Sequence, residues 1–182
     1  MSITKKQFEE VTAICRKVFA DKLQDYGASW RILRPTSVTD QIFIKAKRIR
    51  TLETKKERMV DEGVFSELIG IVNYGLIGLI QIELGYSDLV DIDSETAIEM
   101  YDKYLNMTIE LMNAKNHDYD EAWRSMRISS YTDLILTKIY RTKEIEENEG
   151  VTIASEGIDA NYMDMINYAL FGLIKLHFPE EN

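Results

Sequence analysis

The feature that most constrains the fold is that this sequence repeats itself. Residues Lys22 to Glu53 align without a gap with Lys115 to Glu146, and 13 of these 32 positions are identical. After a shift of one residue, 62–80 align with 156–174, with 8 of 19 positions identical. A spacing of about ninety residues is too long for a solenoid repeat. The sequence therefore predicts two tandem copies of one helical domain, residues 1–90 and 91–182, packed as one compact unit.

The positions that agree between the copies are largely polar. A packed core would retain apolar residues at helical spacing and let the surface vary, so a retained polar set indicates a shared polar site. The matching pairs include Asp25 and Asp118, Tyr26 and Tyr119, Trp30 and Trp123, Arg31 and Arg124, Asp40 and Asp133, Lys45 and Lys138, Arg48 and Arg141, and Asn73 and Asn167.

Apolar residues recur with the period of one helix face in six segments, and no segment alternates as a strand does. The pattern predicts an all-α protein with six main helices, arranged as two three-helix repeats in one pseudo-twofold bundle. The expected helices run from Thr4 to about Gln24, from Ser37 to about Arg58, from Val64 to Gly85, from Asp93 or Ser94 past Met112, from Ser130 onward, and from Ile158 to before Pro179.

Composition excludes several classes of partner and location. The net charge of -9 disfavours duplex nucleic acid. Cys15 is the only cysteine, so no intramolecular disulfide forms, and the N-terminus lacks the apolar run of a signal peptide, which predicts a cytoplasmic protein. Residues 64–84 are the most apolar stretch, but Glu67, Asn73 and other polar residues interrupt it, which favours a buried helix over a membrane span. A homodimer is compatible with the sequence.

Acids and aromatic rings gather where the first and fourth helices should end. Asp25, Tyr26 and Trp30 form one group, and His117, Asp118, Tyr119 and Trp123 form the other. In a loop, Tyr and Trp can clamp a flat ring while the acid binds a metal or the edge of a base. The alternative is that the rings fill the core and the acid caps a turn.

Two basic pairs and two acids recur on the second and fifth helices. Lys45 and Arg48, like Lys138 and Arg141, are three residues apart on one helix face, where they can grip phosphate together or form a solvated surface. Asp40 and Asp133 each follow a serine at an expected helix start. At such positions an acid complements the positive end of the helix dipole, so they need no functional role.

A stripe of polar residues lies on the otherwise apolar last helix. Asn161, Asp164 and Asn167 or Tyr168 share one face, where a carboxylate is costly unless it meets a metal, a cation or a cavity. Magnesium prefers several such oxygen ligands. In the first copy Glu67 and Gly70 replace Asn161 and Asp164, so the second copy should hold any metal site, unless both copies complete it together.

Three motifs agree in order and spacing with a known family. They are Lys115 to Trp123, then Thr132-Asp133 with Lys138 and Arg141, then Glu156 to Ala169. In these residues the chain resembles the nucleotide-modification-associated domain one family, over about Ala114 to Leu173 and more weakly over Lys22 to Ile80. The resemblance implies an association with the handling of modified nucleotides.

The helix that contains Asn161-x-x-Asp164 is also similar to a helix of MazG-like all-α nucleoside triphosphate pyrophosphohydrolases, which hold magnesium with Glu-x-x-Glu and Glu-x-x-Asp motifs. Together these observations predict a nucleotide-binding protein, with magnesium-dependent hydrolysis of a phosphoanhydride as the associated reaction. Asp118, Glu156 and Asp164 are the predicted catalytic acids, and these three with Asp159 are the predicted metal ligands. The predicted substrate-binding residues are Lys138, Arg141, His117, Tyr119, Trp123, Asn167, Asp25, Lys45 and Arg48. The alternative is a non-catalytic helical interaction or scaffold module.

Overall fold

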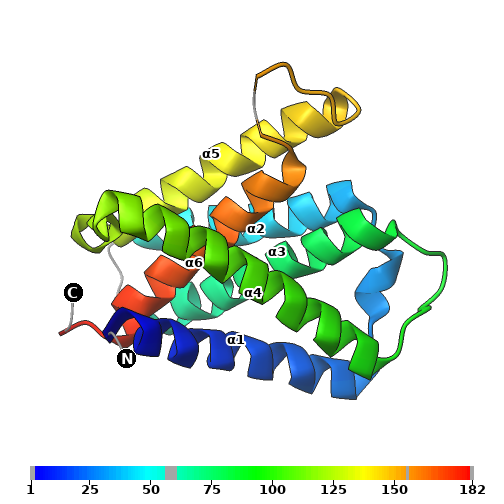
Figure 1. Cartoon of the computed structure of the whole chain (residues 1–182), viewed down its shortest axis with the longest axis horizontal. Coiled ribbons are helices and arrows are strands. Elements are labelled where there is room, and N and C mark those ends of the chain that lie inside the picture. The colour runs from blue at the N-terminus through cyan, green and yellow to red at the C-terminus, as the bar shows by residue number, and fades with distance from the viewer. Residues whose placement is uncertain (1–2, 56–60, 155, 181–182) are drawn as a thin grey trace.

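The computed structural model describes residues 3–55, 61–154 and 156–180, and within them it contains helices and no strand. The prediction of an all-α fold with six main helices is confirmed (Figure 1). The elements are α1 (Ile3–Tyr26), the 3-10 helix η1 (Ser29–Ile32), α2 (Pro35–Thr54), α3 (Asp61–Leu84), α4 (Ser94–Tyr119), the 3-10 helix η2 (Ala122–Ser125), α5 (Ile128–Glu147) and α6 (Ile158–His177).

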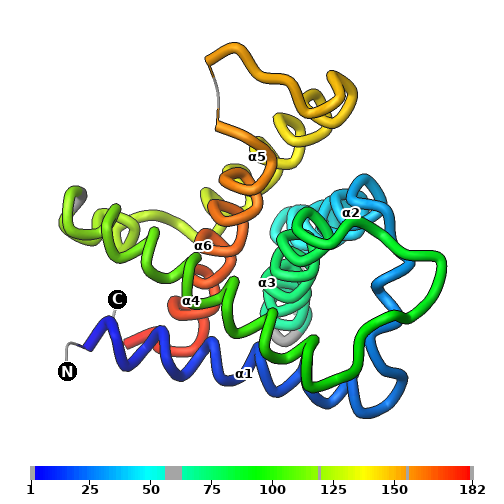
Figure 2. The backbone as a smooth tube through the Cα atoms, turned by 45° about the vertical axis from the view of Figure 1, so that its right-hand side comes forward, coloured from blue at the N-terminus to red at the C-terminus, as the bar shows by residue number. Residues whose placement is uncertain are grey.

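Helices from the two copies pack against one another throughout the molecule. The α3–α6 pair lies in the centre, with α2 and α5 packed on one side and α1 and α4 on the other. Figure 2 shows α6 between α5 and α1. The first turns of α1 and the last turn of α6 meet, where His177 Nε2 lies 2.7 Å from Glu10 Oε1.

α3 and α6 approach closely because two glycines of α3 leave room for α6 side chains. A Cβ atom on Gly75 would lie 2.5 Å from Ile166 Cγ1, and one on Gly78 would lie 2.6 Å from Tyr162 Cε1. By length and composition α3 could cross a membrane, but 67% of its most apolar window is buried inside the protein. α3 is therefore the central core helix, as its interrupting polar residues predicted.

Three helices begin two or three residues earlier than predicted, among them α3, which starts at Asp61 and not at Val64. α2 starts at Pro35, not at Ser37, because proline is pre-set for the first helical position and has no N–H to leave unpaired there. α5 correspondingly starts at Ile128. The expected cap of α4 is confirmed, since Asp93 Oδ1 accepts from the Thr96 backbone N–H at 2.8 Å. The predicted extension of the second helix to Arg58 falls on 56–60, outside the described residues.

The early starts place Asp40 and Asp133 in the second helical turn, so the predicted dipole role of these acids is wrong. They form ion pairs between α2 and α5 instead. Asp40 Oδ1 lies 2.9 Å from Lys143 Nζ, and Asp133 Oδ1 lies 3.9 Å from Arg50 Nε. Because Asp40 aligns with Asp133 and Arg50 with Lys143, the two contacts are reciprocal, as at a twofold interface.

A second reciprocal pair of contacts crosses the same interface. The Thr39 hydroxyl donates to Glu146 Oε1 at 2.7 Å, and the Thr132 hydroxyl donates to Glu53 Oε1 at 2.9 Å. Burial raises the pKa of both carboxyl groups above the usual value for glutamate, although each threonine hydrogen bond opposes the shift. Both groups therefore favour the protonated form more strongly in the folded state than in the unfolded chain.

This shift predicts the direction of a pH dependence. A group whose folded pKa is raised contributes stability below its unfolded pKa, about 4.3 for glutamate, and loses that contribution as pH rises through the folded pKa. Glu53→Gln with Glu146→Gln should remove this loss, because glutamine stays neutral and its carbonyl still accepts from threonine. Denaturant unfolding between pH 4 and 8 should show a higher stability at pH 7 and a flatter profile for the double variant. Glu147→Gln, at an exposed position, is the control and should keep the wild-type profile. If the double variant had the same profile of stability against pH as the wild type, the raised pKa of the two glutamates would be contradicted.

Candidate functional site

Each copy places its tryptophan on a short 3-10 helix directly after a long helix. The predicted loop residues Asp25, His117 and Asp118 instead lie in the last turns of α1 and α4. Trp30 and Trp123 are both buried, at 8% and 5% exposure. The rings therefore pack into the core, and each also forms part of a pocket wall.

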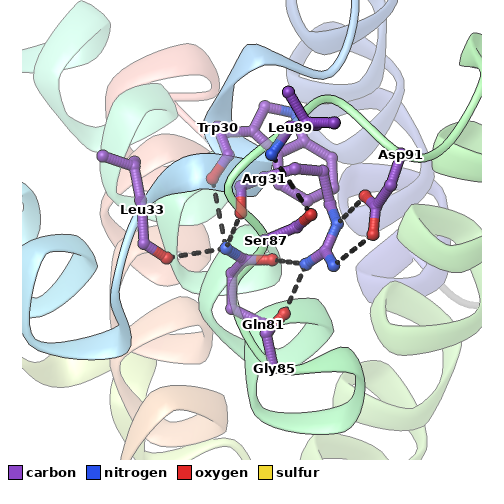
Figure 3. A network of polar contacts seen from close by, with 8 residues as sticks. All are labelled: Trp30, Arg31, Leu33, Gln81, Gly85, Ser87, Leu89 and Asp91. Atoms are coloured by element: carbon purple, nitrogen blue, oxygen red, sulfur yellow. Dashed lines mark hydrogen bonds and ion pairs between the residues drawn. The ribbon is translucent and has the colours of Figure 1, made fainter.

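In the first copy, a network around Arg31 holds η1 on the end of α3 (Figure 3). The buried Arg31 guanidinium donates to both carboxylate oxygens of Asp91, at 2.7 and 3.1 Å, to the Gly85 carbonyl at 2.6 Å and to the Gln81 side chain. The Gln81 amide donates in turn to the carbonyls of Trp30, Arg31 and Leu33.

In the second copy, Lys175 aligns with Gln81 and likewise donates to backbone carbonyls of the 3-10 helix segment. Its ammonium donates to the carbonyls of Arg124 and Met126 at 2.7 and 2.6 Å. These carbonyls align with those of Arg31 and Leu33. Both tryptophans are therefore fixed by polar groups from the end of the following core helix.

A pocket of about 360 Å³ lies between the end of α4, η2 and α6. A carboxylate between two lysines forms one side of this second-copy pocket. Asp164 Oδ1 accepts from Lys115 Nζ at 2.7 Å, and Asp164 Oδ2 lies 2.6 Å from Lys138 Nζ. The Asp164 side chain is only 9% exposed, and that of Lys138 only 14%. Because these charges are paired, their burial costs less free energy than the burial of unpaired charges would.

The pKa of Lys115, which lines the pocket, is changed by this carboxylate. Partial burial acts to lower the pKa of Lys115, but its hydrogen bond and charge interaction with Asp164 outweigh that effect and leave the pKa above the usual lysine value. Lys115 is therefore a fixed cation at neutral pH, and the Asp164 cluster carries one net positive charge.

Two buried polar atoms on the pocket residues have no hydrogen-bond partner among the described residues: Trp123 Nε1 and Asn167 Oδ1. Comparison of the copies explains the second. In the first copy, Asn73 Oδ1 accepts from the Tyr101 hydroxyl at 2.8 Å. Phe8 aligns with Tyr101 and has no hydroxyl to offer Asn167, whose amide nitrogen still donates to the Thr108 carbonyl at 3.3 Å.

A more open groove of about 720 Å³ begins on the other side of the Lys138–Asp164 pair. Lys138, Arg141, Glu156 and Asn161 are among the residues that line it. The second copy thus has a small pocket with an aromatic wall next to a groove with two cations, and the Lys138–Asp164 ion pair separates them.

The structure brings some of the predicted site residues together and leaves others apart. Trp123, Asp164 and Asn167 line the pocket, and Lys138, Arg141 and Glu156 line the adjoining groove. Lys115 was missed as a site residue, although its identity with Lys22 at the start of the aligned segment was a signal for it.

The other predicted residues lie away from the second-copy pocket. His117 and Asp118 are exposed, with 90% and 75% of their side chains accessible, and contact each other at 3.4 Å. Asp25 and Asp159 are exposed, and the Tyr119 side chain lies outside what the structure describes. In the first copy, Lys45 and Arg48 both pair with Glu67, so this pair holds a carboxylate and is not merely a solvated face.

The four predicted metal ligands do not form one group. Within the described residues, no three His, Cys, Asp or Glu side chains are placed to hold a metal ion. Both oxygens of Asp164 already contact lysines, while Asp118, Asp159 and Glu156 are exposed. These side chains as arranged do not fit a protein-bound magnesium ion, and the magnesium site stays a prediction.

The fold and pockets define a duplicated all-α protein whose copies each combine a buried tryptophan with paired cations. Its family is shown by comparison with known proteins: the model of Nucleotide modification associated domain 1 matches twice, over residues 22–82 and 115–176. The chain belongs to this family and contains two copies of its domain. No curated protein and no solved structure matches the chain.

Proposed function

We propose that this protein binds a nucleotide at the second copy, with the base in the 360 Å³ pocket and the phosphates in the adjoining groove. The observation that carries the proposal is the pocket with Trp123 and Phe171 in its wall, next to a groove lined by Lys138 and Arg141. Membership of a family associated with nucleotide modification supports this choice of ligand.

The two unpaired atoms, Trp123 Nε1 and Asn167 Oδ1, are chemically complementary to the edge of a nucleobase. The indole N–H can only donate and the amide oxygen can only accept, whereas base edges present both acceptors and N–H donors. Both atoms are inaccessible to solvent in this structure, so a base pairs with them only if binding turns the Trp123 and Asn167 side chains toward the pocket. An unsatisfied buried polar group costs about 1–3 kcal/mol, and such pairing would recover that free energy. Trp123 and Phe171, whose ring centres lie 4.5 Å apart in a parallel stack, give the pocket an aromatic lining.

The groove supplies the charge that a phosphate requires. Lys138 is oriented by Asp164, and Arg141 on the next turn of α5 is exposed and presents a planar fork suited to phosphate oxygens. These local cations offset the repulsion expected from a chain with a net charge of -9.

Calorimetric titration with a panel of nucleoside mono-, di- and triphosphates tests the proposal. For each nucleotide that binds, Asn167→Leu should weaken the affinity by about 1–3 kcal/mol, roughly 5- to 150-fold, because the base loses its acceptor. Asn113→Leu, at an exposed position on α4, should leave the affinity unchanged. If no nucleotide of the panel gave binding heat, or if both variants bound with equal affinity, nucleotide binding at the second-copy pocket would be overturned. The scaffold alternative would then be favoured.

Hydrolysis of a phosphoanhydride is a narrower proposal, and it rests on the similarity of the α6 motif to MazG-like enzymes. Incubating each nucleotide that binds with magnesium or manganese and measuring the release of pyrophosphate or phosphate tests it. Turnover that is unchanged in Asp164→Ala would remove this acid from the reaction.

A further inference from the structure

We propose that the first copy holds a second ligand site, which takes a nucleoside phosphate with its anionic group between Lys22 and Lys45. A pocket of about 630 Å³ lies there between α1, η1 and α3. Each residue that lines the second-copy pocket aligns with a residue that lines this one, including Lys115 with Lys22, Trp123 with Trp30 and Asp164 with Gly70. The ligand class rests on the proposed function, whereas the pocket and its charge stand on their own contacts.

The first-copy pocket has the cations of the second without its carboxylate. Two lysines, Lys22 and Lys45, line it, and no Asp or Glu is among its described lining residues. A Cβ atom on Gly70 would lie 2.7 Å from Lys45 Cε, so Lys45 lies across the position where the side chain of an aspartate would begin. The missing carboxylate both enlarges the pocket and leaves it positively charged.

The protein only partly compensates this charge itself. Lys45 Nζ lies 3.5 Å from Glu67 Oε2, beyond the usual hydrogen-bond distance, while the other oxygen of Glu67 accepts from Arg48. Lys22 is exposed and has no hydrogen bond or ion pair with any residue that the structure describes. A phosphate from the ligand can therefore take the place that Asp164 occupies between the equivalent lysines.

The walls of the first-copy pocket favour a flat ring but do not distinguish one base from another. Trp30, Tyr26 and Tyr74 line the pocket, and Lys45 Nζ lies 5.6 Å from the centre of the Tyr74 ring. Asn73 Oδ1 accepts from the Tyr101 hydroxyl, and the Asn73 amide nitrogen donates to the Cys15 carbonyl. Because none of its described lining residues has a buried polar atom without a partner, this pocket should bind different bases by stacking, whereas the second-copy pocket should discriminate between them.

The chain contains two tryptophans, one in each pocket, so each site can be followed separately. In Trp123→Phe, the fluorescence of Trp30 should change on titration with nucleoside 5′-monophosphates. The matched nucleosides should bind at least about 10-fold more weakly, because they lack the anion that the two lysines hold. Inorganic phosphate should compete with the monophosphates.

Two further variants in the Trp123→Phe background test the position of the anion. Gly70→Asp introduces into the first copy the carboxylate that Asp164 provides in the second, and it should abolish the fluorescence response of Trp30. Lys22→Gln, at an exposed position that folding does not need, should weaken it about 10-fold, while the exposed Lys17→Gln should not. If Gly70→Asp does not fold, Lys22→Gln decides alone. Equal affinities for monophosphate and nucleoside, or no response of Trp30, would overturn the second site.

The opposite single-tryptophan variant, Trp30→Phe, distinguishes ligand binding at the second-copy pocket from binding at the first-copy pocket. In Trp30→Phe, fluorescence reports only Trp123 in the second copy. A response there without one in Trp123→Phe would leave the proposed function standing and overturn the second site. A response of Trp30 alone would support the second site and count against the second-copy pocket.

Discussion

Replacing Asp164 with alanine should lower the free energy of unfolding by about 3–5 kcal/mol, as expected when one partner of a buried ion pair is removed. The carboxylate contacts Lys115 and Lys138, and Lys138 is itself 14% exposed. Without Asp164, its ammonium would remain in a buried position with no counter-charge that the described contacts supply. Denaturant unfolding of the wild type and Asp164→Ala at pH 7 would measure the difference.

An exposed ion pair provides the matched control. Arg16 and Asp102 form a bidentate pair, but 43% and 39% of their side chains are accessible, so Asp102→Ala should cost about 0.2–1 kcal/mol. The double variant Asp164→Leu with Lys138→Met should regain much of the lost stability, since it removes both buried charges while retaining volume. Similar losses in Asp164→Ala and Asp102→Ala would show that burial of the Asp164 cluster contributes little.

Arg31→Ala should also have a large effect, about 3 kcal/mol or more. The side chain is 2% exposed and joins η1, the end of α3 and the segment that leads to α4 (Figure 3). Removing it leaves the Gln81 oxygen and the Gly85 carbonyl without their charged donor and opens a cavity beside them. The melting temperature and the free energy of unfolding should both fall.

Arg34 provides the comparison for Arg31. It precedes α2 three residues further along the chain and is exposed, so Arg34→Ala should change stability by less than about 0.5 kcal/mol. If both arginine variants lost the same stability, the Arg31 network would not be what holds η1 in place.

The helical architecture could be predicted from the sequence because apolar spacing directly reports which face of a helix is buried. Two helix starts were placed too late because the serine signals at Ser37 and Ser130 competed with Pro35 and with the equivalent Ile128. At these positions a local capping pattern was weaker evidence than a proline in a conformation that suits the first turn.

The candidate site was only partly predictable. The duplication pointed to Asp164, Trp123 and Asn167, which the structure places around one pocket, and to Lys138, which lines the adjoining groove. It equally pointed to Asp118, which is exposed, because a repeated residue carries no information on the direction of its side chain. Pairing of Asp164 with lysines, not with a metal ion, depends on how α4, α5 and α6 are packed, and periodicity within one helix does not determine that.

The difference between the contacts of Asn73 and Asn167 depends on an exchange between helices that lie far apart in sequence. Tyr101 of α4 satisfies Asn73 of the first copy, while Phe8 of α1 packs edge-on against Trp123 of the second copy at 6.2 Å. Each copy therefore receives part of its pocket lining or support from a helix of the other. A single copy on its own would lack this helix, so two such molecules would have to pair to supply it to each other.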